Sequence, residues 1–239
     1  MSDRVALVTG AARGIGEAIA RGLAAEGTTV AVVDVLADEA DAVATSIHGL
    51  AVTADLRDAH DVDAAVAEVV ARYGRLDVLV NNAGIFRSTP LLEISVEEWD
   101  LVFAVNVRSM LLTIQAAAPH LGPGGRIVNI ASMGGQVGEP GQAHYAASKA
   151  AVIALTRVAA MELGSSGVTV NCICPGYVAT DMGAATRSDE QVAAWSATSP
   201  LGRLGTPDDV AGMVRFLVGD DAAYCTGQAF NVNGGMVMT

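Results

Sequence analysis

Short apolar runs of strand length alternate with longer helical patterns along almost the whole chain. The expected strands cover residues 5–9, 29–33, 50–53, 76–80, 126–131, 168–173 and 228–232. The expected helices cover residues 15–26, 38–47, 61–73, 96–117, 145–163 and 207–218. Strands that alternate with helices of about ten or more residues build parallel sheets through βαβ units. Because the strands are apolar throughout, helices must cover both faces of the sheet. The sequence therefore predicts an α/β fold with a doubly wound parallel sheet.

The chain has no linker, internal repeat or low-complexity segment, so we expect residues 1–239 to form a single domain. Only the stretch 175–204 lacks a clear period. Irregular segments of that length are most often functional or mobile. We therefore expect a mobile substrate-binding loop at about 181–204.

Composition excludes several classes of function. Lys and Arg total 14 against 26 Asp and Glu, and the cations are scattered, so the chain would repel a polyanion such as nucleic acid. No apolar run approaches the ~20 residues of a membrane span, and the first residues lack the layout of a signal peptide. The three cysteines and four histidines are too scattered for a disulfide framework or a metal site. We expect a cytoplasmic protein with no metal, no membrane anchor and no nucleic-acid partner.

Three glycines, Gly10, Gly14 and Gly16, lie between the first expected strand and the first helix. Glycine permits a tight turn and lets a pyrophosphate approach the backbone. The helix N-terminus beyond the turn offers free N–H groups and a positive dipole end. The turn therefore predicts a dinucleotide site, although glycine also serves as plain turn punctuation.

Asp34 ends the second strand, 18 residues after Gly16 (34 − 16). A carboxylate at this place accepts hydrogen bonds from the adenosine ribose hydroxyls and repels a 2′-phosphate. Arg13 is the opposing signal, because a cation within the turn could hold that phosphate. We give Asp34 more weight and expect NAD in preference to NADP. The competing interpretation of Asp34 is an ordinary cap of the next helix.

Tyr145 and Lys149 are four residues apart near the start of a helix and therefore share one face. A neighbouring ammonium favours the phenolate and lowers the pKa of a tyrosine from its usual value of about 10. Tyr145 could then exchange a proton with an alcohol or ketone. Ser132 follows the fifth strand, at the sheet edge where ligands bind, and its hydroxyl could hold the substrate oxygen. Taken singly, these residues are consistent with packing and turn roles; their joint spacing favours catalysis.

Several ordered motifs together resemble the short-chain dehydrogenase/reductase superfamily over nearly the whole chain. They are the cofactor turn Thr9-Gly10 to Gly14-Ile15-Gly16, Asp55-Leu56, Asn81-Asn82-Ala83-Gly84, the catalytic set Asn106, Ser132, Tyr145 and Lys149, and Pro175-Gly176-Tyr177-Val178-Ala179-Thr180. The resemblance implies a Rossmann fold and a homotetramer formed through the helix 145–163 and its predecessor. Small residues on that helix permit close helix contact, although they could equally pack on the sheet of the same subunit.

The resemblance also implies roles for individual residues. Asn106 would anchor a water that continues the proton relay, and Lys149 would double as a ribose ligand. Val178 and Thr180 would bind the carboxamide and the pyrophosphate. The full set of expected cofactor contacts is Gly10, Arg13, Gly14, Ile15, Gly16, Asp34, Asp55, Leu56, Asn82, Ala83, Gly84, Tyr145, Lys149, Pro175, Gly176, Val178 and Thr180.

The expected function is hydride transfer between NAD and a secondary alcohol or ketone. Three polar residues, Gln136, Glu139 and Gln142, could join Ser132 and Tyr145 in binding a polyol or sugar alcohol, although a polar surface loop explains them equally well.

The main alternative is a 3-oxoacyl-thioester (acyl-carrier-protein) reductase, which the segment 200–207 also resembles. Asp34 counts against it, because those relatives usually use NADPH. An alternative of another class is a non-catalytic nucleotide-binding scaffold, against which the intact catalytic set argues. His144 adjoins Tyr145, but adjacent helix residues face apart, so we assign it no catalytic role.

Overall fold

Seven parallel strands lie in one sheet in the order β3-β2-β1-β4-β5-β6-β7. The computed structural model describes residues 4–180 and 188–238. The strands are β1 (Val5–Thr9), β2 (Thr29–Asp34), β3 (Leu50–Thr53), β4 (Val78–Asn81), β5 (Arg126–Ile130), β6 (Thr169–Pro175) and β7 (Ala229–Val232). The chain runs outward from β1 to β3 and then crosses back, so that β4 pairs with the other side of β1. The predicted doubly wound parallel sheet is confirmed, with its winding reversed between β1 and β4.

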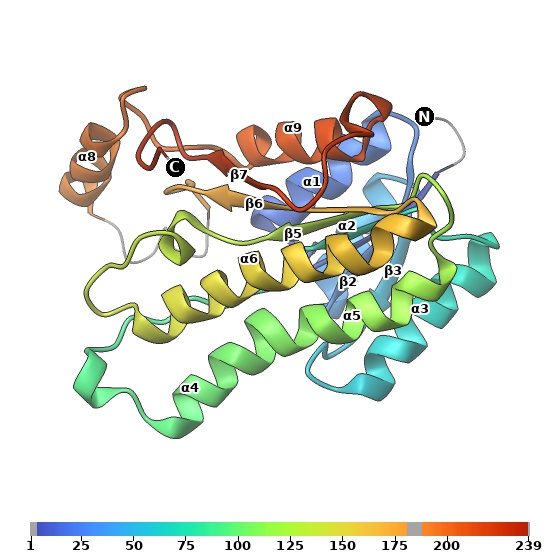
Figure 1. Cartoon of the computed structure of the whole chain (residues 1–239), viewed down its shortest axis with the longest axis horizontal. Coiled ribbons are helices and arrows are strands. Elements are labelled where there is room, and N and C mark those ends of the chain that lie inside the picture. The colour runs from blue at the N-terminus through green and yellow to red at the C-terminus, as the bar shows by residue number, and fades with distance from the viewer. Residues whose placement is uncertain (1–3, 181–187, 239) are drawn as a thin grey trace.

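Helices cover both faces of this sheet. They are α1 (Gly14–Ala25), α2 (Ala37–Ser46), α3 (Ala59–Tyr73), α4 (Val96–Phe103), α5 (Ser109–Ala117), α6 (Ala143–Leu163), α8 (Asp189–Thr198) and α9 (Pro207–Val218). Figure 1 shows α1 and α9 on one side of the strands and α5 and α6 on the other. Successive strand residues point to opposite faces. In β1, Val8 therefore packs in one core with Leu217 of α9, and Leu7 packs in the other with Val66 of α3.

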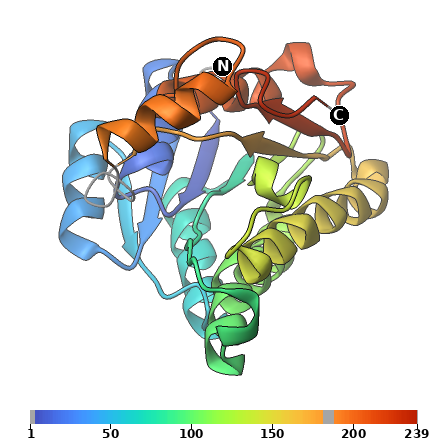
Figure 2. The same ribbon diagram turned by 90° about the vertical axis from the view of Figure 1, so that its left-hand side faces the viewer.

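The carboxyl ends of the strands point to the end of the molecule that Figure 2 faces, where α8 and the first turn of α6 also lie. A buried polar ladder joins the central strands behind this end. Asn81 donates to Asn129 Oδ1 at 2.9 Å and accepts from Thr113 at 2.7 Å, while Asn129 donates to Thr156 at 3.0 Å. These buried groups satisfy one another, so the ladder fixes α5 and α6 against β4 and β5 without an unpaired amide.

The helix predicted at 96–117 is interrupted by a π-helical turn, η2 (Ala104–Arg108), between α4 and α5. Within Val96–His120 a window of 18 residues has a mean hydropathy of 1.5, so this helical span is long and apolar enough to cross a membrane by length and composition. The expectation that no segment reaches that length is therefore wrong. In the structure this span lies over the sheet, and its apolar residues Met110, Ile114 and Ala117 are buried in the cores. We interpret it as a core helix.

The segment 175–204, expected to be an irregular loop, contains the helix α8. Ser188 and Gln191 form a capping box at its start, in which each side chain bonds the other residue's backbone N–H. None of its residues is buried, so the apolar period that would reveal a helix in the sequence is absent. Residues 181–187 of the expected substrate loop lie outside the described residues.

Candidate active site

Ser132 and Tyr145 meet at the carboxyl edge of the sheet. Ser132 follows β5, and Tyr145 lies in the first turn of α6. A β-carbon placed on Gly134 would stand 3.4 Å from Ser132 Oγ and 3.6 Å from Tyr145 Cε1, so this glycine lies between the two side chains. The Gly134 N–H donates to Ser132 Oγ at 3.0 Å, which leaves the hydroxyl hydrogen to point elsewhere. The two hydroxyl groups predicted to bind one substrate oxygen are thus brought together.

The phenol of Tyr145 has a raised pKa in this structure. Burial is the main cause, and a hydrogen bond with Ser132 acts in the opposite direction. The ring meets Phe86 edge to face, with centroids 5.0 Å apart, and Lys149 Nζ lies 5.8 Å from the ring centroid. In the protein alone, desolvation of the phenolate outweighs any effect of the Lys149 ammonium on this pKa. The phenol is consequently protonated at neutral pH. That Lys149 lowers the pKa once the dinucleotide is bound stays a prediction.

Lys149 is almost fully buried, at 4% exposure. Burial lowers the pKa of its amine to about 8, because desolvation disfavours the ammonium. The Nζ atom donates to the Ile130 carbonyl at 2.9 Å. A β-carbon on Gly84 would stand 3.4 Å from Nζ and 3.3 Å from Asn106 Oδ1. The amine therefore lies between β5 and the segment after β4, with N–H groups left for further partners.

Asn106 is fully buried in the π-helical turn η2. Its Oδ1 accepts from the Ile85 N–H at 2.8 Å, and its Nδ2 donates to the Ile85 carbonyl and to Ser148 Oγ, both at 3.0 Å. Ser148 Oγ in turn donates to the Tyr145 carbonyl at 2.7 Å. Asn106 thus connects the segment after β4 to the helix that carries Tyr145. Its expected role as a water anchor stays a prediction.

The glycine turn fits a dinucleotide. Gly10 and Gly14 have φ near +61° and +62°, which L side chains rarely adopt. A β-carbon on Gly16 would stand 2.1 Å from Gly10 O, so only glycine fits there. Asn82 Nδ2 donates to the carbonyls of Thr9 and Gly10 at 3.0 and 2.9 Å, which clamps the turn to the segment after β4.

The start of α1 is open to an anion. Its N-cap is Arg13, whose side chain is exposed and makes no cap hydrogen bond. The first N–H groups of α1 are therefore left for another acceptor, which is the setting in which helix N-termini bind phosphate. Thr180 stands beside this turn, since a β-carbon on Gly14 would lie 3.7 Å from its Cγ2. Thr180 thus lies next to Gly14 at the start of α1.

Asp34 lies at the end of β2, beside the same turn. Its carboxylate accepts from the Ala12 N–H at 3.0 Å and from the Leu36 N–H at 3.2 Å. The N-cap of α2 is Leu36, and α2 has no side-chain cap, so the competing interpretation of Asp34 as the helix cap is wrong. The carboxylate holds the turn in place and presents its remaining lone pairs at the sheet edge.

Three other expected cofactor contacts, Asp55, Leu56 and Ala83, already contact other parts of the protein or are buried in it. The Asp55 carboxylate is bound by the Arg57 guanidinium, with Nε at 2.9 Å and Nη2 at 2.5 Å, and this contact lowers the pKa of Asp55. Leu56 is buried, at 8% exposure. Ala83 lies against Gly10, where a β-carbon would stand 2.7 Å from Ala83 Cα. An adenine amine would therefore have to share Asp55 with Arg57.

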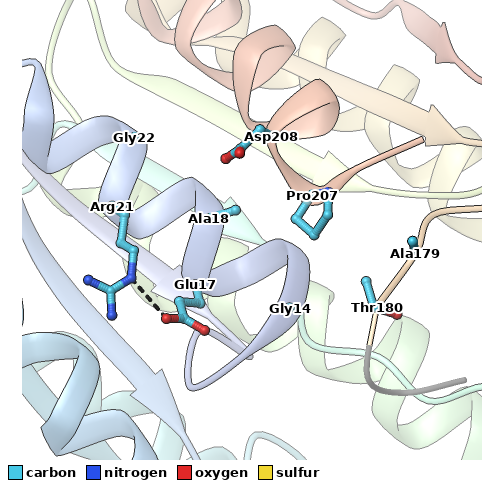
Figure 3. A pocket seen from close by; sticks show the side chains of 9 residues that line it. All are labelled: Gly14, Glu17, Ala18, Arg21, Gly22, Ala179, Thr180, Pro207 and Asp208. Atoms are coloured by element: carbon cyan, nitrogen blue, oxygen red, sulfur yellow. Dashed lines mark hydrogen bonds and ion pairs between the residues drawn. The ribbon is translucent and has the colours of Figure 1, made fainter. Parts of the chain in front are cut away.

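A cavity of about 520 Å³ extends from the glycine turn between α1 and the start of α9 (Figure 3). Its lining residues are Gly14, Glu17, Ala18, Arg21, Gly22, Ala179, Thr180, Pro207 and Asp208. Arg21 Nε binds Glu17 Oε1 at 2.8 Å, so the one cation of this lining is already paired. Gly14, Ala179, Thr180 and Pro207 stand in the sequence motifs named above. The other lining residues had no signal in the sequence, because the cavity depends on how α1 and α9 pack.

Two of the three polar residues proposed for a polyol, Glu139 and Gln142, are bound within the protein, whereas the buried Oε1 of Gln136 has no hydrogen-bond partner among the described residues. Glu139 accepts from the Tyr177 hydroxyl and from Gln142 Nε2, both at 2.6 Å. Tyr177 also stacks on Trp195 of α8, with ring centroids 4.6 Å apart. Burial and the Glu139 carboxylate raise the pKa of Tyr177, so it remains a donor. Glu139 and Gln142 therefore form an internal clasp that the sequence did not reveal, because Tyr177 and Trp195 lie far from them along the chain.

The chain can now be compared with known proteins. The family model described as Enoyl-(Acyl carrier protein) reductase matches residues 10–237. The 3-oxoacyl-[acyl-carrier-protein] reductase FabG of Staphylococcus aureus (strain Mu50) is 46% identical, over 98% of each chain. The 3-oxoacyl-[acyl-carrier-protein] reductase of Synechocystis sp. is 45% identical, over 100% of this chain and 98% of that protein.

Solved structures agree over the same length. A dehydrogenase/reductase from Sinorhizobium meliloti 1021 has a TM-score of 0.96 at 42% identity and covers 100% of this chain and 96% of its own. A short chain dehydrogenase from Burkholderia cenocepacia J2315 in complex with NADP has a TM-score of 0.93 at 41% identity, over 98% of each chain. A non-catalytic scaffold is set aside by these matches. The chain belongs to the short-chain dehydrogenase/reductase superfamily, whose members are nicotinamide-dependent oxidoreductases that act on CH–OH and carbonyl groups.

Proposed function

We propose that the chain reduces 3-oxoacyl thioesters to 3-hydroxyacyl thioesters. The observation that carries this proposal is identity of 45–46% over essentially the whole chain to two proteins named for that reaction. The polyol hypothesis loses support, because the Glu139 carboxylate already accepts from Gln142 Nε2 and from the Tyr177 hydroxyl. The earlier alternative therefore becomes the preferred function.

The chemistry assigns one task to each residue of the site. The nicotinamide, when bound, supplies the hydride. Ser132 holds the carbonyl oxygen, and Tyr145 donates a proton to it. The phenol carries its proton at neutral pH, as a general acid must before the reaction. Asn106 joins the segment after β4 to α6 through Ile85 and Ser148. Lys149 bonds the Ile130 carbonyl at the end of β5, and its remaining N–H groups are left for the ribose.

The test is a comparison of substrates. We expect 3-oxoacyl thioesters to be reduced with a kcat/KM at least about 100-fold above that for polyols or simple secondary alcohols in the reverse direction, because a matched binding site discriminates by about this factor or more. Steady-state rates followed by nicotinamide absorbance give the comparison, with the Tyr145→Phe protein as the blank. Turnover confined to polyols would contradict the proposal.

We also propose that NAD(H) is preferred to NADP(H), on the strength of the Asp34 carboxylate at the end of β2. The relative that was solved with NADP favours the opposite choice, as does the exposed Arg13. Charge supports NAD(H), since a carboxylate and a 2′-phosphate close together repel each other by an amount comparable to about 1 kcal/mol or more.

Replacing Asp34 by Asn should lower the ratio of kcat/KM for NADH to that for NADPH by about tenfold, which corresponds to about 1.4 kcal/mol. The amide keeps an acceptor for the Ala12 or Leu36 N–H while it loses the charge. Asp38→Asn, an exposed change on α2, is the matched control. A ratio that is the same in Asp34→Asn and wild type would show that Asp34 does not select the cofactor.

Assembly into a homotetramer stays a prediction. Ala150 and Ala154 of α6 are exposed, so they do not pack on the sheet of their own subunit. Val158 and Met161 on the same helix are 46% and 75% exposed. An apolar helix face of this kind supports contact with a second copy.

A further inference from the structure

We propose that His144 and Glu98 are positioning residues that hold Tyr145 in place for proton transfer. His144 precedes Tyr145 in the first turn of α6 and is fully buried. Its side chain points away from the substrate side, toward α4, where Nε2 lies 3.3 Å from Glu98 Oε1. The inference rests on the proposed role of Tyr145 as the proton donor.

The Glu98 carboxylate joins three segments around Tyr145. Its Oε1 accepts from His144 and also from Thr89 Oγ1, at 2.9 Å. Thr89 lies in the segment after β4, and its N–H donates to the Gly141 carbonyl at 2.8 Å, just before α6. One oxygen on α4 thus fastens both the entry to α6 and the segment that approaches it from β4.

The protonation of the pair follows from its contacts. The hydrogen bond from Thr89 is the main cause that lowers the pKa of Glu98, and His144 and Arg87 act in the same direction. Glu98 is therefore an ionised acceptor, so Nε2 of His144 must carry the hydrogen. The Nδ1 atom is buried and has no hydrogen-bond partner within residues 4–180 and 188–238. A hydrogen on Nδ1 would be buried unpaired, so we place the bonding hydrogen on Nε2, facing Glu98.

The first turn of α6 has no side-chain cap, so the contact between His144 and Glu98 helps to hold it in place. Its N-cap is Gln142, which makes no side-chain cap hydrogen bond and instead donates from Nε2 to Glu139. The Tyr145 ring rests against Phe86, in the same segment as Thr89. If Glu98 released His144, the helix end and the ring's neighbour would be free to shift together. A displacement of about 1 Å at a reacting group can cost up to about 100-fold in rate.

The test compares His144→Leu with His144→Gln in the full chain. Leucine fills much of the ring's volume without a donor, whereas the glutamine amide can donate to Glu98 from nearly the same distance. We expect His144→Leu to lower kcat at least about tenfold while the cofactor KM stays within about twofold, because only the geometry of proton transfer is disturbed. His144→Gln should recover most of the lost kcat.

Glu98→Gln provides a second test. It removes the charge of the group that accepts from His144 and leaves the buried His144 ring in place. The Glu98 side chain is 23% exposed, so the change is made at the less buried partner of the pair. Glu98→Gln should lower kcat in the same direction as His144→Leu. Glu93→Gln is the matched control, since Glu93 is exposed on the neighbouring turn η1 (Leu91–Glu93) and lies outside the pair. Thermal denaturation of every variant accompanies the kinetics and measures any effect on folding.

Two results would overturn the inference. The first is a kcat for Glu98→Gln and His144→Leu within twofold of wild type, whatever the change in melting temperature. The second is a His144→Gln protein as slow as His144→Leu, which would show that ring shape rather than the hydrogen bond matters. If His144→Leu does not fold, Glu98→Gln decides alone. The assay uses whichever carbonyl compound the wild type reduces, so a failure on thioesters contradicts the proposed function and leaves this comparison intact.

Discussion

Tyr145→Phe should lower kcat at least about 100-fold, because general acid catalysis by a positioned side chain is worth about that factor or more. The change removes one oxygen and leaves the ring in its edge-to-face contact with Phe86. Cofactor affinity should therefore survive. Single-turnover reduction and cofactor titration, run on the same preparation, separate the two quantities.

The control for this prediction is Tyr224→Phe, which removes a hydroxyl from a fully exposed tyrosine. It should leave kcat unchanged. If Tyr145→Phe keeps kcat within tenfold of wild type, another group donates the proton, and the assignment of the general acid is wrong.

Gly16→Ala should abolish useful cofactor binding, with a Kd at least about 100-fold higher, equivalent to about 2.8 kcal/mol. The new methyl would stand 2.1 Å from Gly10 O and 2.5 Å from Asn82 Nδ2. The backbone of the turn and the amide that clamps it would both have to move, and the phosphate cradle would be lost with them. Calorimetric titration with the dinucleotide measures the change.

Gly212→Ala is the control for a glycine-to-alanine change in a helix. Its β-carbon would meet its nearest neighbour, Arg215 Nη2, at 4.0 Å, so no clash arises, and alanine favours the helix. A Gly16→Ala protein that binds the dinucleotide within twofold of wild type would show that the turn adapts and that the backbone contact is not essential.

The sheet and most helices can be predicted from the sequence, because each of these elements has a pattern of apolar residues within its own short segment. The strands contain short apolar runs such as 5–8, and α9 has apolar residues at a helical period between its Thr206 capping box and Gly219. Such patterns can be recognised in the sequence without knowing which residues lie across the sheet. The helix α8 was missed for the opposite reason, since it buries no residue and is defined by its cap.

The residues of the candidate site follow from motif spacing, but their electrostatics do not. The distance of four residues between Tyr145 and Lys149 is visible in the sequence, whereas the burial that raises one pKa and lowers the other is a property of the folded surroundings. The clasp of Glu139, Gln142 and Tyr177 is missed likewise, because hydrogen bonds between distant segments leave no period in the chain.

The π-helical turn at Ala104–Arg108 places one more residue in the coil than a regular helix would hold. Each residue of an α-helix turns the chain by about 100°, so the faces of α4 and α5 are offset by that angle. Straightening the rod would improve its internal regularity and swing the Asn106 amide away from Ile85. The irregular turn therefore gives up regular helical hydrogen bonding and in exchange keeps the Asn106 amide bonded to Ile85.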